Sequence, residues 1–310
     1  MNDRMNHGVS LWGIVAALAL LTGCGNDNEA TGTPADGPVA LEVTGGIQVN
    51  TRAHDNQWDT NDAIGIYMLT PGTTEVAEDT KNRHYTTAAE GETGTFRPAE
   101  AGQTIYFPID GSRVDFLAYY PYRTPLENNV YKVDVSQQGV QKDIDLMASE
   151  APVTGDKLSP AVAFRFKHRL VNLRLTIKTD GKVLKDEALD GMTVKITNQP
   201  TTADFNVLPR TLSNISTDKT ELELLVTNQG KTCEGIVLPN TTTEGMYLVF
   251  TLTNGATFSW NIHSASQSQF FAAGSQYKYD ITITGTGLEV TSTVADWTPG
   301  NGAGENGNAE

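Results

Sequence analysis

The sequence predicts an all-β protein with a sandwich architecture. Apolar and polar side chains alternate with a period of two in many short stretches, which is the pattern of a strand with one buried face. Gly, Pro, Asn and Asp separate these stretches at intervals short enough for turns to reverse the chain. Strand and helix patterns do not succeed one another regularly, so a parallel α/β sheet is not expected. Many short antiparallel strands around a core indicate sandwiches.

The clearest strand patterns lie in the second half of the sequence. Residues 173–178 alternate Leu or Ile with polar side chains, and Thr-rich outer positions suit a pleated surface. Asn254-Gly255 predicts a two-residue type I′ hairpin. The helical signal is confined to 182–189, where a short helix is expected. The expected strands are 173–178, 192–197, 221–226, 247–253, 256–262, 277–284 and 288–297.

The first residues have the pattern of an export signal. Arg4 lies in a polar start, and the apolar run 9–21 is shorter than the ~20 residues that a spanning helix needs. Residues 1–23 therefore read as a signal peptide. The run ends in Leu-Thr-Gly-Cys24, which resembles the bacterial lipobox, so Cys24 is the expected site of lipidation. An ordinary signal peptide with an incidental cysteine, or a short membrane anchor, are the alternatives.

Composition suggests which partners to expect. Residues 24–38 are polar and acidic, as expected of a solvated tether, and resemble the surface-export signal of Bacteroidota lipoproteins. The outer face of the outer membrane is therefore expected rather than the periplasm. The formal net charge is −15, and basic residues do not form a stripe with interleaved aromatics, so a nucleic-acid partner is not expected.

The chain is long enough for two domains. The best boundary lies near 165–171, which divides the chain into an N-terminal β-sandwich domain, 39–168, and a C-terminal one, 169–297. Residues 298–310 form an expected flexible tail. Apart from Cys24 the sequence holds one cysteine, Cys233, so an internal disulfide is not expected. No internal repeat is evident.

Several stretches, taken together and in order, resemble the fimbrillin family of Bacteroidota, which comprises the subunits of type V pili and their relatives. The stretches are Thr51-Arg52-Ala53 with Trp58, Asp62 and 64–68; 105–108 with 114–122; 145–148 with Phe164, Phe166, His168 and Leu170; and 295–300. They extend over the mature chain and follow a lipobox.

The resemblance implies two tandem transthyretin-like antiparallel Greek-key sandwiches that assemble by donor-strand exchange. Cleavage between Arg52 and Ala53 would remove a leading strand within 39–49, and a strand of a neighbour would fill the groove. The expected partners are other fimbrillin-like subunits, the outer membrane through the lipid, and host or bacterial surface ligands. The alternative is that Arg52 is a surface turn residue and the leading strand stays. The expected donor is the last strand, with apolar residues Leu288, Val290, Val294 and Trp297.

No pattern in the sequence predicts an enzyme, a cofactor or a metal centre. Gly230-Lys231-Thr232 lacks the earlier glycine of a phosphate loop. Asp55, Asp59, Asn61 and Asp62 could bind calcium but are better explained by a turn with a capping Asp.

The second functional hypothesis is a glycan-binding surface lipoprotein that does not polymerise. The aromatic cluster Phe116, Tyr119, Tyr120 and Tyr122 could stack on sugar rings, although core packing explains it as well. His168 and Cys233 are expected to pack rather than react.

Overall fold

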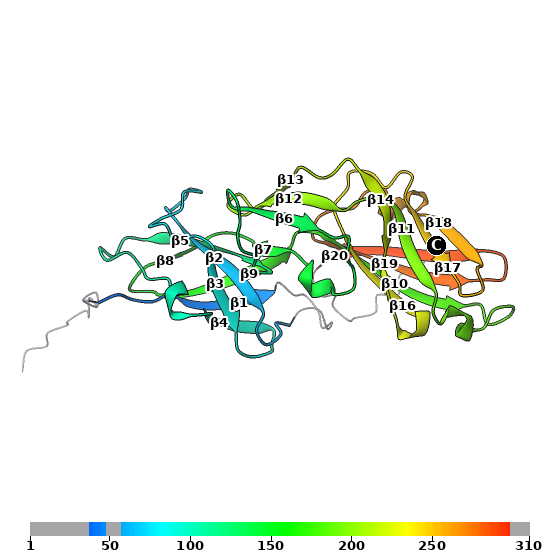
Figure 1. Cartoon of the computed structure of the whole chain (residues 1–310), viewed down its shortest axis with the longest axis horizontal. Coiled ribbons are helices and arrows are strands. Elements are labelled where there is room, and N and C mark those ends of the chain that lie inside the picture. The colour runs from blue at the N-terminus through cyan, green and yellow to red at the C-terminus, as the bar shows by residue number, and fades with distance from the viewer. Residues whose placement is uncertain (1–36, 48–56, 298–310) are drawn as a thin grey trace, which may run out of the picture. The chain divides into compact units, whose positions relative to one another are not determined.

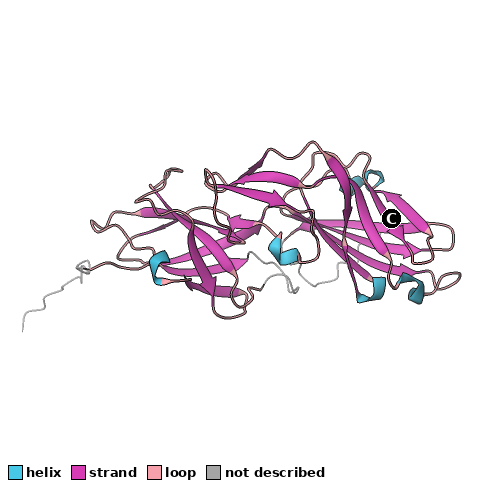
Figure 2. Ribbon diagram, viewed as in Figure 1, coloured by secondary structure: helices cyan, strands magenta, loops and turns pink. Residues whose placement is uncertain are grey.

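The structure, a computed structural model, describes residues 37–47 and 57–297. In these ranges the chain forms strands joined by turns, and its helices are short 3-10 turns (Figure 2), which confirms the all-β prediction. None of the described helices is long and apolar enough to cross a membrane. The 3-10 helices are η2 (Ala101–Gln103), η3 (Gln141–Asp143), η4 (Asp186–Leu189), η5 (Asn228–Gly230), η6 (Ile262–Ser264) and η7 (Ser266–Ser268).

Residues 39–168, here the N-terminal half, contain an eight-stranded sheet (Figure 1), of which seven strands form a closed ring and β8 pairs with β5 beside it. The order is β2-β3-β4-β1-β9-β7-β5-β8, and an additional pairing of β2 with β5 closes the ring. Closure leaves few free edges, and the apolar side chains point inward. The strands are β1 (Glu42–Ile47), β2 (Ala63–Leu69), β3 (Arg83–Thr87), β4 (Thr93–Pro98), β5 (Val114–Tyr120), β7 (Met147–Ser149), β8 (Val153–Gly155) and β9 (Ala161–His168).

Residues 169–297, here the C-terminal half, form two sheets around a second core. A five-stranded sheet has the order β15-β16-β10-β19-β20, and a four-stranded sheet has the order β14-β11-β17-β18. Alternating side chains of both sheets fill the space between them. The strands are β10 (Val171–Thr179), β11 (Thr193–Pro200), β14 (Lys219–Glu223), β15 (Leu225–Thr227), β16 (Thr232–Val237), β17 (Tyr247–Thr251), β18 (Thr257–Asn261), β19 (Ser275–Ile283) and β20 (Leu288–Asp296).

A third, three-stranded sheet joins the two halves. Strand β6 (Val130–Asp134) comes from the N-terminal half and pairs with β12 (Thr202–Asn206), which pairs in turn with β13 (Thr211–Ser213). Beneath this sheet lies a core with residues from both halves, among them Tyr119, Phe205 and Trp297. Each half also has a core of its own. The division at residue 168 into two domains remains a prediction.

Two pairings differ from the antiparallel expectation. Strand β1 runs parallel to β9, and β10 runs parallel to β19. Antiparallel neighbours can be joined by a short hairpin, whereas parallel neighbours need a long connection. In both halves the first strand meets a partner that follows much later in the chain, and alternation alone does not reveal such a pairing.

Three local expectations need correction. The expected single strand 221–226 is two strands, because the chain leaves the four-stranded sheet after β14 and enters the five-stranded sheet with β15. The hairpin at Asn254-Gly255 forms, but Gly255 alone of the pair has a positive φ, 83°, so the turn is not type I′. The amide of Gly255 donates to the carbonyl of Leu252, and the amide of Leu252 donates to the carbonyl of Ala256, so three residues, 253–255, separate this closing pair. The expected helix over 182–189 is reduced to η4.

Candidate functional site

Strand β1 is an inner strand of the closed sheet. It pairs antiparallel with β4 on one side and parallel with β9 on the other. The apolar side chains Leu41, Val43 and Ile47 point into the core, and their exposed fractions are 5%, 2% and 5%. Removal of this strand would leave two unpaired strand edges and an open apolar groove, here called the β1 slot.

Aromatic rings form the floor of the β1 slot. The indole N–H of Trp58 donates to the carbonyl of Gly45 at 2.7 Å. Trp58 also packs edge-on against Phe96 and Phe166, with ring centroids 5.0 and 5.1 Å apart. A Cβ atom at Gly45 would lie 3.0 Å from a ring carbon of both Phe96 and Phe166. The rings therefore require a small residue at position 45 of β1.

Strand β20 carries the predicted donor residues and lies at the edge of its sheet (Figure 1). Among the described strands it pairs only with β19, and the paired residues run from Leu288 opposite Ile283 to Asp296 opposite Ser275. Leu288 and Val290 are half-buried against the C-terminal core, whereas Val294 is 38% exposed. An edge strand with half-exposed apolar side chains is held less firmly than an inner strand such as β1.

The chain just after β20 contacts the N-terminal half through Trp297. Its indole stacks on the imidazole of His168, with centroids 3.9 Å apart and planes 6° apart. His168 Nδ1 lies 2.8 Å from Asp145 Oδ1, and both rings are buried. The sequence placed His168 as a packing residue but did not reveal that Trp297 is its partner. Period-two alternation describes one strand at a time and contains no signal for this contact.

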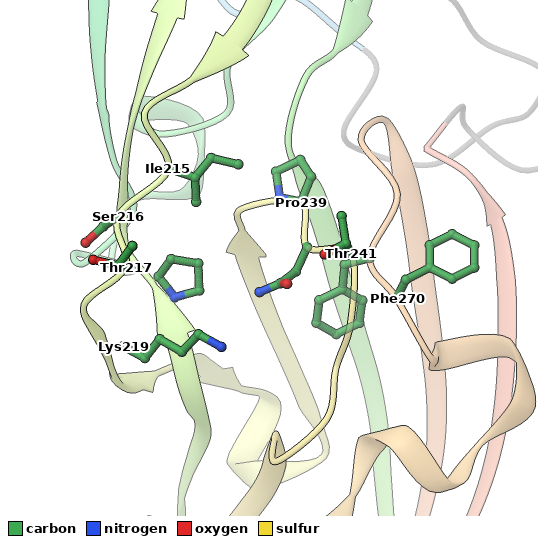
Figure 3. A pocket seen from close by; sticks show the side chains of 10 residues that line it. Ile215, Ser216, Thr217, Lys219, Pro239, Thr241 and Phe270 are labelled. Atoms are coloured by element: carbon green, nitrogen blue, oxygen red, sulfur yellow. The ribbon is translucent and has the colours of Figure 1, made fainter.

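An apolar groove of about 690 Å³ opens on the C-terminal half. Figure 3 shows Ile215 and Phe270 on opposite sides of it, with Pro239 and Thr241 between them. The exposed fractions of Ile215 and Phe270 are 39% and 53%. The sequence did not predict this groove, because its walls come from three separate loops, 215–217, 239–241 and 270–271, together with Pro200 of β11 and Lys219 of β14. Its lining residues are Pro200, Ile215, Ser216, Thr217, Lys219, Pro239, Asn240, Thr241, Phe270 and Phe271.

The predicted processing residues lie outside the described residues. This applies to Cys24, Arg52 and Ala53. Ile47 and Gln57, the described residues on either side of 48–56, both line one cavity of about 220 Å³, which Trp297 also lines.

Comparison with known proteins decides the family. The family model described as fimbrillin-like matches residues 51–297. The chain belongs to the fimbrillin-like family. A protein of Bacteroides uniformis named "Putative fimbrium subunit Fim1C" is 52% identical over 297 residues, which are 95% of this chain and 96% of the relative.

Solved structures agree with this fimbrillin-like assignment. A crystal structure described as a putative cell adhesion protein from Bacteroides uniformis is 50% identical and has a TM-score of 0.76, covering 86% of this chain and 100% of that one. A second protein so described, from Bacteroides ovatus, is 21% identical with a TM-score of 0.66 over 86% of this chain and all of that one, which shows a shared fold.

The fimbrillin-like family is structural and adhesive, so this chain is not an enzyme. Candidates for chemistry in its sequence have structural roles. Asp62 accepts a hydrogen bond from the backbone N–H of Asp59 at 2.7 Å, as expected of a capping turn. Among the described residues no group of three acidic, His or Cys side chains is arranged to hold a metal. Burial raises the pKa of the Asp62 carboxyl, to which the Tyr120 hydroxyl donates at 3.2 Å.

The aromatic cluster considered for sugar binding is mostly internal. Tyr119 is fully buried and Tyr120 is 6% exposed. Tyr122 is half-buried, and its ring stacks on His84 with centroids 4.0 Å apart. Cys233 is also buried, and burial raises the pKa of its thiol. These side chains in the fimbrillin-like chain pack rather than present a flat surface to a ligand.

Proposed function

We propose that this chain is a cell-surface fimbrial subunit, exported as a lipoprotein and assembled by exchange of strand β1. The names of its relatives support this proposal, since one is called a fimbrium subunit and another a cell adhesion protein. The lipobox-like end of the signal supports lipidation at Cys24, and the acidic residues that follow support the outer face of the outer membrane. The other partners would be further fimbrial subunits.

The inner position of β1 is the observation that carries the proposal. A strand with neighbours on both sides leaves a complete set of backbone donors and acceptors when it is removed. Its apolar side chains leave a dry groove over Trp58. A strand from another molecule can satisfy both through main-chain hydrogen bonds and alternate side chains. Cleavage between Arg52 and Ala53 would free β1, because Arg52 follows it in the chain.

The proposal also includes a finer description of the fold. The two halves would be two transthyretin-like Greek-key sandwiches in tandem. Two features support it: each half has its own core, and in each the first strand runs parallel to a late one, β1 to β9 and β10 to β19.

The rival function, glycan binding without polymerisation, has less support. It needs exposed aromatic rings in a flat patch, and Tyr119 and Tyr120 are buried.

Cleavage of the purified precursor with an arginine-specific protease tests assembly. We expect a ladder of oligomers on a native gel after the cut at Arg52. The matched control is R52K, which keeps the charge and removes the cleavage site, and it should stay monomeric while cuts elsewhere are unchanged. A protein that stays monomeric after complete cleavage at Arg52 would refute assembly by exchange of β1. Incorporation of labelled palmitate, lost in C24S, tests the anchor separately.

A further inference from the structure

Strand β9 and the residue after it carry a row of basic side chains. The sequence Arg165-Phe166-Lys167-His168-Arg169 alternates basic side chains with rings. Successive side chains of a strand point to opposite faces, so the rings of Phe166 and His168 are buried, whereas Arg165 is exposed and Lys167 and Arg169 are half-buried. At about 3.3 Å per residue, the row from Arg165 to Arg169 is about 13 Å long.

A fourth cation lies next to this row, in the turn between β12 and β13. Arg210 and Pro152 line one pocket, and Pro152 follows β7. The guanidinium of Arg169 donates to two carbonyls of β7, that of Ala148 at 3.3 Å and that of Ser149 at 2.9 Å. Burial, and then the nearby charge of Arg210, lower the pKa of Arg169, so the two guanidinium groups are neighbours. The basic strip, as named here, comprises Arg165, Lys167, Arg169 and Arg210.

One carboxylate accompanies the basic strip. Lys167 Nζ lies 2.6 Å from Glu150 Oε1, and these side chains are 42% and 41% exposed, so water competes with the pair. Among the described residues, the three arginines of the strip form no ion pair with a carboxylate. Four cations less one anion give this surface a formal charge of +3, in a chain whose net charge is −15.

This charge distribution favours an anionic partner. Cations held side by side on one strand repel one another, and an anion placed over them relieves the repulsion. A local positive field on an acidic molecule also concentrates anions at this surface. Arg169 is held in place by two carbonyls before any partner arrives, so little side-chain freedom is lost when it binds one.

We propose that the basic strip binds a linear anionic polysaccharide, which carries sulfate or carboxylate groups along its length. The planar fork of an arginine matches the paired oxygens of either group. The cations stand in a row, so a linear polyanion meets more of them than a compact ion does. This binding goes beyond the assembly proposed above, and it does not depend on exchange of β1.

The surroundings of the strip favour a sugar over other polyanions. Single-stranded nucleic acid binds through exposed rings on which its bases stack, and Phe164 and Phe166 of β9 are buried in the core. A protein interface usually has an apolar centre. Among the described residues, none of the large apolar side chains that are exposed belongs to β1, β7 or β9. A hydroxylated, charged sugar chain needs neither feature.

The proposed site differs from the two places where a sugar could otherwise be expected. It recognises charge and does not use the buried rings of Tyr119 and Tyr120, on which the rival function depends. The pocket beside Arg210 is not the anion site either, because Glu75 and Asp115 also line it. The ligand therefore lies along the strip, outside that pocket.

Binding of the uncut chain, in a C24S background, to immobilised polysaccharides tests the proposal. We expect dextran sulfate or polygalacturonate, or both, to bind, and neutral dextran not to bind. The two polyanions distinguish sulfate from carboxylate as the preferred group. Binding should weaken as salt is added, because the Debye length falls to about 10 Å at 0.1 M and screens exposed charges.

Substitutions with opposite effects on charge locate the site. R165Q with K167Q should weaken binding by about 10-fold, because two exposed cations of the strip are lost. E150Q should tighten binding by about 2- to 5-fold, because it removes the carboxylate of the strip, and a merely structural role of Glu150 would not give this gain. The matched control is K178Q with K182Q, which removes two exposed cations from the C-terminal half and should leave binding unchanged.

Four outcomes would overturn the proposal. These are no binding of either polyanion at low salt, equal weakening by the control pair, weaker binding of E150Q, and tighter binding of poly-glutamate or single-stranded DNA than of both polysaccharides. The last result would assign the strip to a protein or nucleic-acid partner. None of these results bears on exchange of β1, because the chain is uncut throughout.

Discussion

The imidazole of His168 lies flat on the indole of Trp297, with ring centroids 3.9 Å apart. His168 is the last residue of β9, which is the neighbour of β1 in the closed sheet, and Trp297 directly follows β20. This stack therefore connects the end of the proposed donor strand to the N-terminal half. For β20 to enter another molecule, Trp297 has to leave His168, so the stack opposes premature exchange.

Truncation of Trp297 should weaken the protein and loosen β20. W297A removes a buried aromatic side chain from the core shared by both halves, at an expected cost of about 3–5 kcal/mol in the free energy of unfolding. Urea denaturation measures this cost, and hydrogen exchange should show faster opening of β20 than of the other strands. The control F116A, in the N-terminal core, should lower stability without selective opening of β20. If all strands of W297A opened at equally increased rates, the stack of Trp297 on His168 would not be what holds β20 in place.

The side chain of Leu41 should contribute to the stability of the protein only while β1 is in place. In the uncut chain L41A removes a side chain that is 5% exposed, so we expect a loss of about 2–5 kcal/mol. In assembled filaments made after cleavage, the same substitution should leave stability unchanged, because β1 has been discarded. Denaturation of both forms measures the difference. E42A, at the exposed first position of β1, should change the unfolding free energy of the uncut chain by about 0.5 kcal/mol or less. An equal effect of L41A in both forms would show that β1 stays.

Alternation along the sequence predicted several strands of the C-terminal half, because each pattern shows which face of one strand is buried, but it did not give β12, β13 or β16, or the strands β2 to β9 of the N-terminal half. It placed β10, β17, β19 and β20 close to their observed bounds. The parallel pairing of β1 with β9 was not predicted, because it joins residues far apart in the chain. The same limit hid the pairing of β6 with β12 and the stack of Trp297 on His168. Of the proposed site, the sequence predicted β1 and β20 as strands but not that β1 is an inner strand between β4 and β9.

Position 65 has no room for a side chain, and the sequence alone does not show why glycine is needed there. A Cβ at this position on β2 would collide with the ring of Tyr119 and with Asn82 Oδ1, which accepts a hydrogen bond from the Tyr119 hydroxyl at 2.7 Å. G65A should therefore displace Tyr119 and cost about 1–3 kcal/mol. Thermal denaturation measures the loss. G102A is the control, because nothing lies within 4 Å of its added Cβ. A neutral G65A would mean that Tyr119 moves freely.

Two carboxyl groups should contribute to stability with opposite pH dependence. Burial raises the pKa of Asp62 above its ordinary value of 3.8, so the folded state holds this proton more tightly than the unfolded state does. Its contribution is fully present below 3.8 and is lost as the pH rises through the raised pKa. Hydrogen bonds from Asn214 and Lys132 lower the pKa of Asp204, whose contribution is present above the ordinary value and is lost as the pH falls.

Unfolding free energies of D62N and D204N, measured from acid to neutral pH, test this contrast. The difference between wild type and D62N should become less favourable to wild type as the pH rises. The difference between wild type and D204N should change in the opposite direction. Slopes of the same sign would show that Asp62 is solvated rather than buried.

Cys233 should be unreactive for as long as the chain is folded. Its side chain is fully buried between both sheets of the C-terminal half, and burial raises the pKa of the thiol, so little of the reactive thiolate forms. In a C24S chain we expect a thiol reagent at pH 8 to react only at the rate of unfolding. C233S should cost about 1–3 kcal/mol, because it buries a hydroxyl in an apolar core, and C233A should cost less if the site closes around the smaller side chain. Rapid labelling of the folded C24S chain would mean that the two sheets separate readily, which would make β20 easier to detach than its nine-residue pairing with β19 indicates.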